Sequence, residues 1–229
     1  ATSSNAGSNN TIKIQPGVQS WRNITVNDIY TNCLNYNKTL NSHMMKNDEW
    51  GAVAYLSKSK YGKNAEVDIN SDSSYYTGGG SGNAYVTNVG QSTTGTVHGV
   101  YDMSGGAWEY VAAYVNNGNS NLTNYGSSLV NGDAKTKNVY SKGSSDSRDN
   151  NYSANSGKYG DAVYETSANG NSSSSSWYGD YSYFPNTSGP FFGRGGYYTN
   201  GTFAGVFYFG NDNGNSDSID SFRPVLVAL

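Results

Sequence analysis

The segment GVYDMSGGAWEYV at residues 99–111 carries the most specific pattern in the chain. Gly105 and Gly106 allow a tight turn, because glycine adopts backbone conformations that other residues avoid. A patterned apolar stretch follows from Ala107 to Val115 and predicts a strand. The segment therefore predicts a turn that delivers Trp108 to the interior at the start of a strand.

The C-terminal run GRGGYYTNGTFAGVFYFGNDNGNSDSIDSFRPVLVAL, residues 193–229, is the second informative stretch. Between its Arg-Gly-Gly opening and its apolar end lie mostly Tyr, Phe, Asn, Asp, Ser and Gly, which supply rigid aromatic area and adaptable hydrogen bonding. No Lys, Glu, Gln, Met or Trp occurs from Tyr197 to Ser221. Strand alternation predicts that Phe207 and Phe209 share one face and that Tyr208 takes the other.

Two arginines stand near the ends of this run. A guanidinium offers five donors and stays charged, so Arg194 and Arg223 are expected to connect strands by donating to backbone carbonyls. Together with Trp108 and Glu109, we interpret both arginines as parts of the scaffold.

Two short helices are predicted before residue 65. The first runs from about Val26 to Tyr36 and places Cys33 on its apolar side as a buried, inert thiol. The second begins near Asn47, whose side chain can cap the first turn, and stops at Gly62. Gly51 costs this helix about 1 kcal/mol relative to alanine, which favours close packing at that position.

The rest of the sequence predicts strand fragments, small antiparallel sheets and long irregular loops. Thr11–Ile14 alternates as a short strand, and it is expected to pair with Pro224–Leu229 to close the domain. The polar segments Asn116–Gly132 and Lys142–Ser176 are interpreted as loops that embedded Tyr and Trp side chains hold down.

Composition restricts the class of protein. Charged residues make up 14% of the 229 residues and aromatic residues another 14%, whereas disordered chains are rich in charge and poor in aromatics. We therefore expect one α+β domain over residues 11–229, after a flexible leader at residues 1–10. The net charge of −3, without a basic cluster, argues against a nucleic-acid partner.

The environment is also indicated by what the sequence contains. No apolar run approaches the ~20 residues that span a bilayer, so we expect no membrane insertion within the chain. The single cysteine permits no intrachain disulfide, which is ordinary for extracellular proteins of bacteria and their viruses.

Four motifs, in order, resemble one family. The 99–111 segment resembles the NVYDMSGNVWEWV signature of the formylglycine-generating-enzyme branch of the C-type lectin fold. GRGGYY at 193–198 is similar to that family's RGGSW element, SFRPVLV at 221–227 to its closing GFRCV strand, and MKNDEWGAVAYL at 45–56 to its TEAEWEYAAR helix. The resemblance implies a C-type lectin fold for the domain.

The same branch includes the variable proteins of diversity-generating retroelements. In those proteins the hypervariable positions cluster just before the final strand, and adenine-directed mutagenesis of AAY codons cannot produce Lys, Glu, Gln, Met or Trp. These are the residue types missing from Tyr197 to Ser221. The resemblance therefore implies a variable region at residues 193–222.

Enzymatic alternatives follow from the same resemblance. Copper-dependent formylglycine-generating oxidases need a cysteine pair, and iron-dependent relatives need several histidines, whereas this chain has Cys33, His43 and His98. Phe184-Pro185-Asn186 and Gly210-Asn211-Asp212 each lack a required member of the calcium-dependent sugar-binding motifs. We expect no catalytic residue, no metal ligand and no cofactor, and a structural calcium ion stays open.

The predicted function is non-catalytic binding of a protein or glycan ligand on another cell or host, by a retroelement-diversified protein displayed on a bacterial or virion surface. A divergent metal-dependent enzyme and a structural, pilus-like surface protein are the alternatives. The predicted ligand contacts are Tyr197, Tyr198, Phe203, Asn211, Asn213, Asn215, Asp217, Ile219 and Asp220. Tyr and Phe would supply desolvated anchors there, while Asn and Asp would fix the orientation of the ligand.

Overall fold

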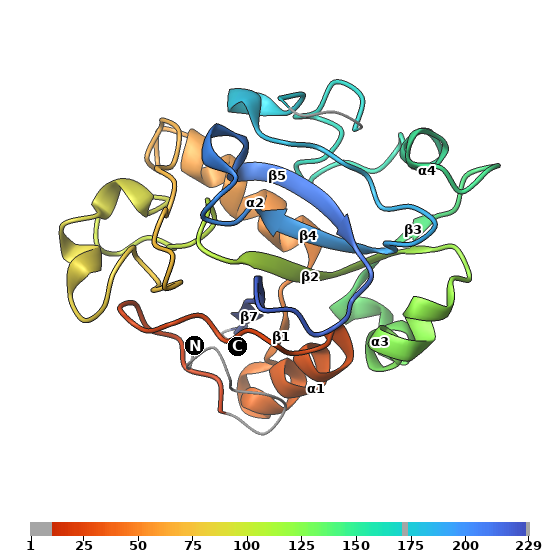
Figure 1. Ribbon diagram of the computed structural model, residues 1–229, viewed down its shortest axis with the longest axis horizontal. Helices are drawn as coiled ribbons and strands as arrows, with labels where there is room; N and C mark the ends of the chain where they lie inside the picture. Colours follow the sequence, from red (N-terminus) through yellow and green to blue (C-terminus); the bar gives the residue numbers. More distant parts are fainter. Residues whose placement is uncertain (1–10, 171–173, 228–229) are drawn as a thin grey trace.

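A mixed five-stranded sheet forms the centre of the protein (Figure 1). The computed structural model describes residues 11–170 and 174–227. The strands of the sheet are β2 (Trp108–Asn116), β3 (Asn138–Ser141), β4 (Phe191–Gly195), β5 (Gly205–Asp212) and β6 (Asp220–Phe222). β4 is antiparallel to both β2 and β5, whereas β3 and β6 run parallel to β2 at different positions along it.

Helices cover both faces of this sheet. In Figure 1, α2 (Asn47–Lys58) lies behind the sheet, and α1 (Val26–Tyr36) lies with α3 (Ser120–Asn131) below it. Strand alternation divides the side chains of β2 between two cores. Val111 packs in the core that contains Trp50 of α2, and Tyr110 packs in the core that contains Ile29 of α1. The strand is thus buried on both faces.

Smaller elements complete the fold. A two-stranded antiparallel sheet joins β1 (His43–Met44) to β7 (Pro224–Val225), and α4 (Arg148–Ala154) lies near β3. Short 3₁₀ helices occupy Lys38–Leu40, Ala84–Val86, Val89–Gln91, Ala134–Thr136, Trp177–Gly179 and Gly201–Phe203. No helix within the described residues has the length and apolar character needed to cross a membrane.

The first predicted helix is confirmed with the predicted bounds, and Thr25 caps it by accepting a hydrogen bond from the Asp28 amide. Cys33 is fully buried, as predicted, and burial raises the pKa of its thiol. The expected capping role of Asn47 is wrong. Asn47 is the first residue of α2 and is buried, and its side-chain amide donates to the Tyr140 hydroxyl at 2.8 Å. The helix also ends earlier than predicted, at Lys58 rather than at Gly62.

The α+β class is confirmed, and β1 and β7 form one small antiparallel sheet, but the prediction of only two helices and of antiparallel sheets alone is wrong. The described residues form four α-helices, and the main sheet is mixed. Both extra helices lie in segments that were expected to be loops. In α3 only Leu122, Gly126 and Leu129 are buried, so a narrow apolar stripe on a polar sequence is enough to dock it.

The expected pairing of the chain ends is also wrong. Residues 11–15 form no strand, and β7 pairs with His43 and Met44 instead. Ile14 is 55% exposed, so the alternation at 11–14 does not bury its apolar side chains evenly. The predicted leader at residues 1–10 lies outside the described residues.

Both scaffold arginines connect distant segments as predicted. Arg194 is fully buried in β4 and donates to the Asn47 side chain at 2.9 Å and to the carbonyls of Asp161 and Ala162. Arg223 donates to the Tyr101 carbonyl at 2.8 Å and to both carboxylate oxygens of Glu109. A buried guanidinium with several directed bonds fixes the relative positions of the segments that it joins.

Gly51 packs closely, as its cost to the helix predicts. A Cβ atom at this position would lie 2.3 Å from the carbonyl oxygen of Gly160. We predict that Gly51→Ala destabilises the fold by about 1–3 kcal/mol through overpacking, although helix propensity alone favours alanine. The exposed neighbour Ala52 is the control, since Ala52→Gly should cost only about 1 kcal/mol. Chemical denaturation measures both changes, and a stabilised Gly51→Ala variant would contradict the packing.

Asp180 makes stability depend on pH. Its Oδ2 accepts the Phe207 amide at 2.9 Å, but its buried Oδ1 has no hydrogen-bond partner among the described residues. Burial raises the pKa of Asp180 to about 8. The folded state therefore holds a proton that the unfolded chain has already lost, and stability increases as the pH falls through 8.

We predict that Asp180→Asn removes this component of the pH dependence. Between pH 9 and pH 6 the free energy of unfolding of the unmodified protein should rise by on the order of 2 kcal/mol more than that of the variant. Urea denaturation of both proteins at several pH values measures the difference. Parallel pH profiles for the two proteins would show that Asp180 is not responsible.

Candidate functional site

Seven aromatic rings form a continuous row, which we call the aromatic row. Neighbouring ring centroids are 5.1 to 6.2 Å apart, within the range of favourable aromatic contacts. In order, the rings belong to Tyr75, Tyr198, Tyr197, Trp108, Tyr208, Tyr181 and Tyr183. All but Tyr208 are partly exposed, so the row presents aromatic surface to solvent.

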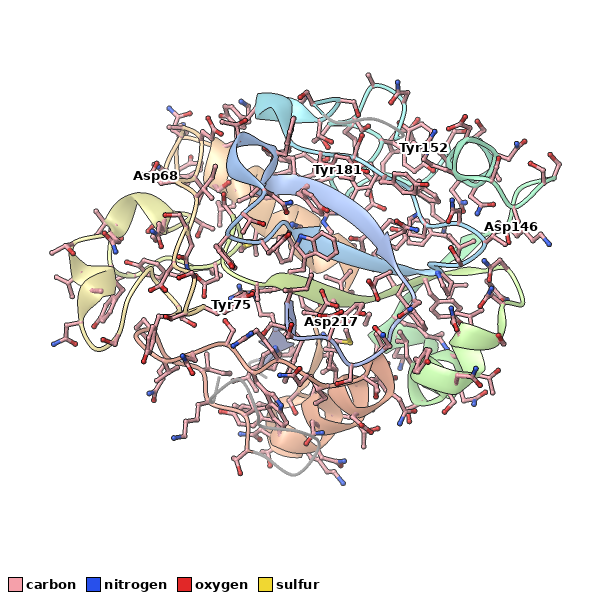
Figure 2. All side chains as sticks on the ribbon, in the orientation of Figure 1. Asp68, Tyr75, Asp146, Tyr152, Tyr181 and Asp217 are labelled. Carbon is pink, nitrogen blue, oxygen red and sulfur yellow. The ribbon has the colours of Figure 1, made fainter. Side chains whose placement is uncertain are left out.

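The row lies on the face of the sheet opposite α2. Phe207 and Phe209 pack in the core that contains Trp50 of α2, and Tyr208 lies on the other side of β5, as predicted. In Figure 2, which labels two members of the row, Tyr75 lies near the lower edge of the sheet and Tyr181 near its upper edge. The row therefore crosses the sheet rather than following one strand.

Two pairs of glycines position the centre of the row. Gly105 and Gly106 have φ values of 75° and 72°, and Gly195 and Gly196 have values of 82° and 74°. These left-handed conformations favour glycine. The two turns are bonded to each other, because the Gly105 amide donates to the Gly195 carbonyl at 3.0 Å. The Tyr198 amide donates to the Gly106 carbonyl at 2.9 Å, so the two turns together fix the position of Tyr197 and Tyr198. The turn at Gly105 and Gly106 was predicted from the sequence.

Asn200 fixes the rings at the centre of the row. Its side-chain oxygen accepts hydrogen bonds from the Trp108 indole at 3.0 Å and from the Tyr197 amide at 2.8 Å. The 3₁₀ helix that follows exposes Phe203, which is 41% accessible. The structure therefore brings together three of the predicted contacts, Tyr197, Tyr198 and Phe203.

An arginine lies over a tyrosine ring at each end of the row. The guanidinium carbon of Arg22 is 3.7 Å from the centroid of Tyr75, and that of Arg148 is 4.7 Å from the centroid of Tyr183. Cation–π contacts at these distances restrain the terminal rings. Burial lowers the pKa of Arg22, and the nearby tyrosine hydroxyls oppose that shift.

The connection from β5 to β6 holds four further predicted contacts, all partly buried. The Ile219 carbonyl accepts the Trp108 amide at 2.9 Å, so Ile219 lies beside the centre of the row. Asp217, labelled in Figure 2, accepts the Ile219 amide and is also bonded to Asn23 through its carbonyl. Asn213 accepts the Asn215 amide at 2.9 Å. The side chains of Asn213 and Asp217 therefore hold the main chain of the connection in shape through hydrogen bonds within it.

Three asparagines of the predicted set lie away from the row. Asn211 donates to the Asn186 side chain at 3.3 Å, near the end of β5. Asn213 and Asn215 flank Gly214, whose carbonyl accepts the amide of Val26, the first residue of α1. Asn213 and Asn215 therefore lie beside the start of α1, whereas Asn211 lies beside Asn186.

Asp220, the ninth predicted contact, is buried and not accessible to a ligand in this structure. It is 2% exposed and lies in β6 beside Trp108 of β2. Burial raises the pKa of Asp220 well above its usual value, with further contributions from Asp212 and Asp217. The Tyr110 hydroxyl donates to Asp212 and is also bonded to Asp220. Asp220 and Ser221 are both buried, whereas alternation along a strand with one buried face would bury only one of two neighbours. Asp220 therefore has a structural role.

Sequence reasoning missed several members of the row. Trp108 was expected in the interior, but its side chain is only partly buried, because it lies at the start of β2 beyond the core that holds Tyr110. Tyr75, Tyr181 and Tyr183 were not proposed as contacts. The alternation Tyr181-Ser182-Tyr183 is the sequence signal for two rings on one face, and those rings are stacked at an interplanar angle of 9°.

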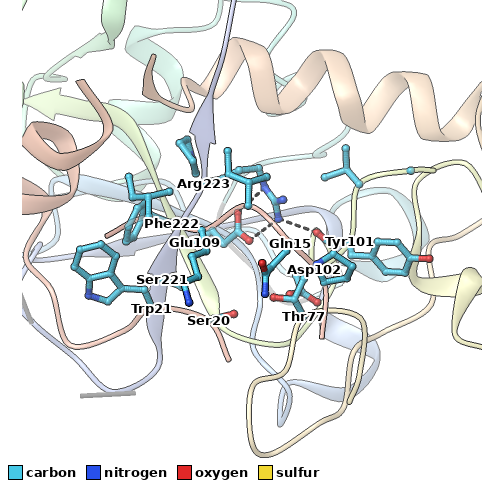
Figure 3. A pocket seen from close by; sticks show the side chains of 17 residues that line it. Gln15, Ser20, Trp21, Thr77, Tyr101, Asp102, Glu109, Ser221, Phe222 and Arg223 are labelled. Carbon is cyan, nitrogen blue, oxygen red and sulfur yellow. Dashed lines mark hydrogen bonds and ion pairs between the residues drawn. The ribbon is translucent and has the colours of Figure 1, made fainter. Parts of the chain in front are cut away.

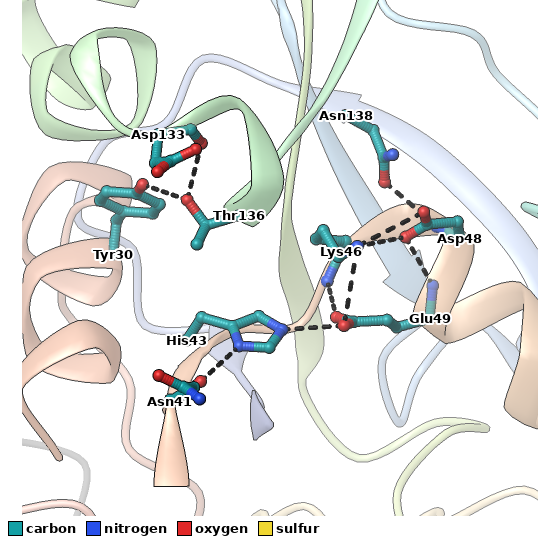
Figure 4. A network of polar contacts seen from close by, with 9 residues as sticks. All are labelled: Tyr30, Asn41, His43, Lys46, Asp48, Glu49, Asp133, Thr136 and Asn138. Atoms are coloured by element: carbon teal, nitrogen blue, oxygen red, sulfur yellow. Dashed lines mark hydrogen bonds and ion pairs between the residues drawn. The ribbon is translucent and has the colours of Figure 1, made fainter. Parts of the chain in front are cut away.

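The histidines do not gather with other metal-ligand side chains in the described part of the chain, where no three His, Cys, Asp or Glu residues form a group that could hold a metal ion. His43 binds Glu49 through Nε2 at 2.8 Å and the Asn41 carbonyl through Nδ1 (Figure 4). The hydrogen bond that His43 donates to the Glu49 carboxylate raises the pKa of His43. In the same view Lys46 contacts Glu49 and Asp48 at the start of α2, so this is a structural polar network.

Comparison with known proteins adds no family to these observations. Neither a protein-family model nor a curated protein sequence matches this chain.

Proposed function

We propose that this protein is a non-catalytic ligand-binding protein whose contact surface is the aromatic row together with Phe203 and Ile219. In this proposal it has a C-type lectin fold of the formylglycine-generating-enzyme branch, is diversified by a retroelement, and is displayed on a bacterial or phage surface. The observation that carries the binding proposal is the continuous row of partly exposed rings on one face of the sheet.

The geometry of the row suits recognition of a protein or a glycan. Tyrosine and tryptophan provide large contact areas with few rotatable bonds, and their polar atoms can bond at the edge of an apolar contact. Here the rings are already restrained by one another, by Asn200 and by the two arginines. Little conformational entropy is then lost on binding, which favours affinity.

The order of the family-like motifs supports diversification, and the structure narrows where it could act. Within residues 193–222, Tyr197, Tyr198 and Phe203 are accessible, whereas Phe207 and Phe209 are fully buried. Exchange of a buried aromatic side chain would cost about 3–5 kcal/mol. A retroelement acting on this gene must therefore spare the core positions of the same region.

We predict that copies of this gene from related strains differ mainly at Tyr197, Tyr198, Phe203 and Ile219, and keep Phe207, Phe209 and Asp220. Sequencing such copies tests this, and the flanking DNA should hold a reverse-transcriptase gene and a near-copy of the 3′ end. Differences spread evenly along the chain would contradict diversification and favour a structural surface protein.

We also predict that the triple variant Tyr197→Asn, Tyr198→Asn and Phe203→Asn weakens ligand binding by at least tenfold, because it removes the accessible rings at the centre of the site. Its thermal unfolding midpoint should fall by only a few degrees, since all three side chains are partly exposed. Binding is measured on immobilised glycans and on intact bacterial cells.

A matched control replaces exposed tyrosines elsewhere. Tyr61 and Tyr159 are 75% and 71% exposed and lie outside the row. The Tyr61→Asn and Tyr159→Asn double variant should bind like the unmodified protein. If it loses as much binding as the triple variant, the aromatic row is not the specific contact surface.

A further inference from the structure

Five asparagines in this chain are each followed by glycine, the dipeptide in which an asparagine side chain is most easily hydrolysed. The pairs begin at Asn117, Asn131, Asn169, Asn200 and Asn213. The reaction starts when the amide nitrogen of the next residue attacks the side-chain carbon Cγ, and glycine has no Cβ to hinder that attack. It therefore needs an unbonded amide and a peptide that can rotate. The structure divides the five pairs by these two requirements.

Three of the pairs meet neither requirement, those at Gly132, Gly170 and Gly214. Each of these amides already donates a hydrogen bond, at 2.9 to 3.2 Å. Each glycine is also enclosed, because a Cβ atom there would lie no farther than 2.6 Å from a tyrosine or phenylalanine side chain. Rotation of these peptides would have to displace closely packed rings.

The pairs at Gly118 and Gly201 meet both requirements. Both glycines are exposed, and apart from their chain neighbours no atom of the described residues lies within 4 Å of the place that a Cβ would take. Neither amide has a hydrogen-bond partner in the part of the chain that the structure describes. Asn117 and Asn200 are therefore the two asparagines that can react in the folded protein.

The side chain of Asn200 is the better prepared of the two. Its Oδ1 accepts hydrogen bonds from the Trp108 indole at 3.0 Å and from the Tyr197 amide at 2.8 Å. Negative charge develops on this oxygen when Cγ is attacked, and donors already directed at the oxygen stabilise that charge. The Nδ2 atom, which must leave, has no hydrogen-bond partner among residues 11–170 and 174–227.

In Asn117 the leaving group is held instead. Its Nδ2 donates to the Asp146 carboxylate and to the Asn186 carbonyl, at 3.4 Å each, and its Oδ1 accepts the Asn119 amide at 3.0 Å. Both bonds to Nδ2 must break before the nitrogen can depart. We therefore expect Asn117 to react more slowly than Asn200.

The donors to Asn200 can hold their positions during the attack. The indole belongs to the start of β2, where the next residue, Glu109, is paired with Arg223 through two hydrogen bonds (Figure 3). The peptide that joins Asn200 to Gly201 lies in an exposed turn. Its rotation gives up the hydrogen bond from the Phe203 amide to the Asn200 carbonyl, which at 3.2 Å is at the long end of the usual range.

From this arrangement we infer that Asn200 is a site of spontaneous self-modification, at which the side chain cyclises with the Gly201 amide and is then hydrolysed to aspartate or isoaspartate. The bond from the Gly201 nitrogen to Cγ forms as the bond from Cγ to Nδ2 breaks, and Nδ2 leaves as ammonia with the proton of the Gly201 amide. Water then opens the succinimide ring. Cleavage at Cγ gives aspartate, and cleavage at the main-chain carbonyl carbon gives isoaspartate.

The conversion changes the centre of the aromatic row. Aspartate places a negative charge beside the Trp108 indole, and isoaspartate lengthens the main chain by one atom and moves the oxygen to which Trp108 and Tyr197 donate. Ligand binding at the row should then decline as the protein ages. This consequence rests on the proposed function, whereas the conversion of Asn200 does not.

Peptide mass spectrometry of the full chain tests the inference. Folded protein is incubated at pH 8 for several weeks and digested at acidic pH, and the fraction of acid is followed at all five asparagines. Asn200 should convert fastest, and at least tenfold faster than Asn131, Asn169 and Asn213. In guanidinium chloride the five rates should become similar, because unfolding exposes every pair. Equal rates at Asn200 and the three enclosed pairs in folded protein, or unchanged rate differences in the unfolded chain, would overturn the inference. A slower reaction at Asn200 than at Asn117 would overturn it too, since the bonds to Oδ1 would then protect the side chain.

Two reciprocal variants identify the attacking amide. Gly201→Ala adds a Cβ beside it, so conversion of Asn200 should slow at least tenfold while that of Asn117 is unchanged. Gly118→Ala should have the reverse effect. Alanine has room at both positions, although their φ values of 55° and 76° favour glycine, and circular dichroism verifies that each variant is folded. An unchanged rate at Asn200 in folded Gly201→Ala would overturn the role of that amide.

The indole N–H resonance of Trp108 reports on the row without a ligand. It should shift with the time course of Asn200 conversion, because its hydrogen-bond acceptor changes. A constant resonance would overturn the effect on the row. Binding to immobilised glycans and to intact bacterial cells should fall over the same period. If the resonance shifts and binding persists, the proposed function fails and the conversion stands.

Discussion

The burial of β2 on both faces is the constraint on which the rest of the structure depends. The strand pairs with β4 along one edge and with β3 and β6 along the other, so its position cannot shift without breaking three pairings. Its alternate side chains enter two different cores. A change of register by one residue would exchange the contents of both cores, which makes the register strongly specified.

This constraint also separates the aromatic row from the ion pair between Glu109 and Arg223. Trp108 and Glu109 are consecutive residues at the start of β2, and they point to opposite sides of the strand. Trp108 joins the aromatic row, whereas Glu109 binds Arg223. The turn at Gly105 and Gly106 fixes where β2 begins, so one local feature of the sequence positions both side chains.

Local patterns predicted the elements whose contacts are local. The apolar spacing around Cys33 defined α1 correctly, and alternation assigned Phe207 and Phe209 to one face of β5. The chemistry of guanidinium groups predicted the roles of Arg194 and Arg223. These inferences succeeded because the residues within each element already determine which face is apolar or where donors are needed.

Long-range contacts could not be predicted in this way. The partner of β7 depends on where α1 delivers residues 43–44, and α3 depends on two leucines that dock a polar helix. The aromatic row joins rings as far apart in sequence as Tyr75 and Tyr198. Asp220 was predicted to be exposed, but it is buried because β6 pairs with β2. The sequence of β6 alone does not reveal that pairing. The C-type lectin assignment depends on motif resemblance and stays a proposal.

Tolerance of sequence change should therefore vary within the C-terminal region according to what each side chain supports. Asn200, Asn213 and Asp217 accept hydrogen bonds from main-chain amides, so they hold the loops in shape and their replacement would leave donors unpaired. Phe203 has no such role, since its main chain, not its ring, is bonded to Tyr181. A binding surface can change its specificity with the smallest loss of stability at side chains that make no hydrogen bond to the main chain. In this protein those side chains are the accessible aromatic ones in and beside the aromatic row.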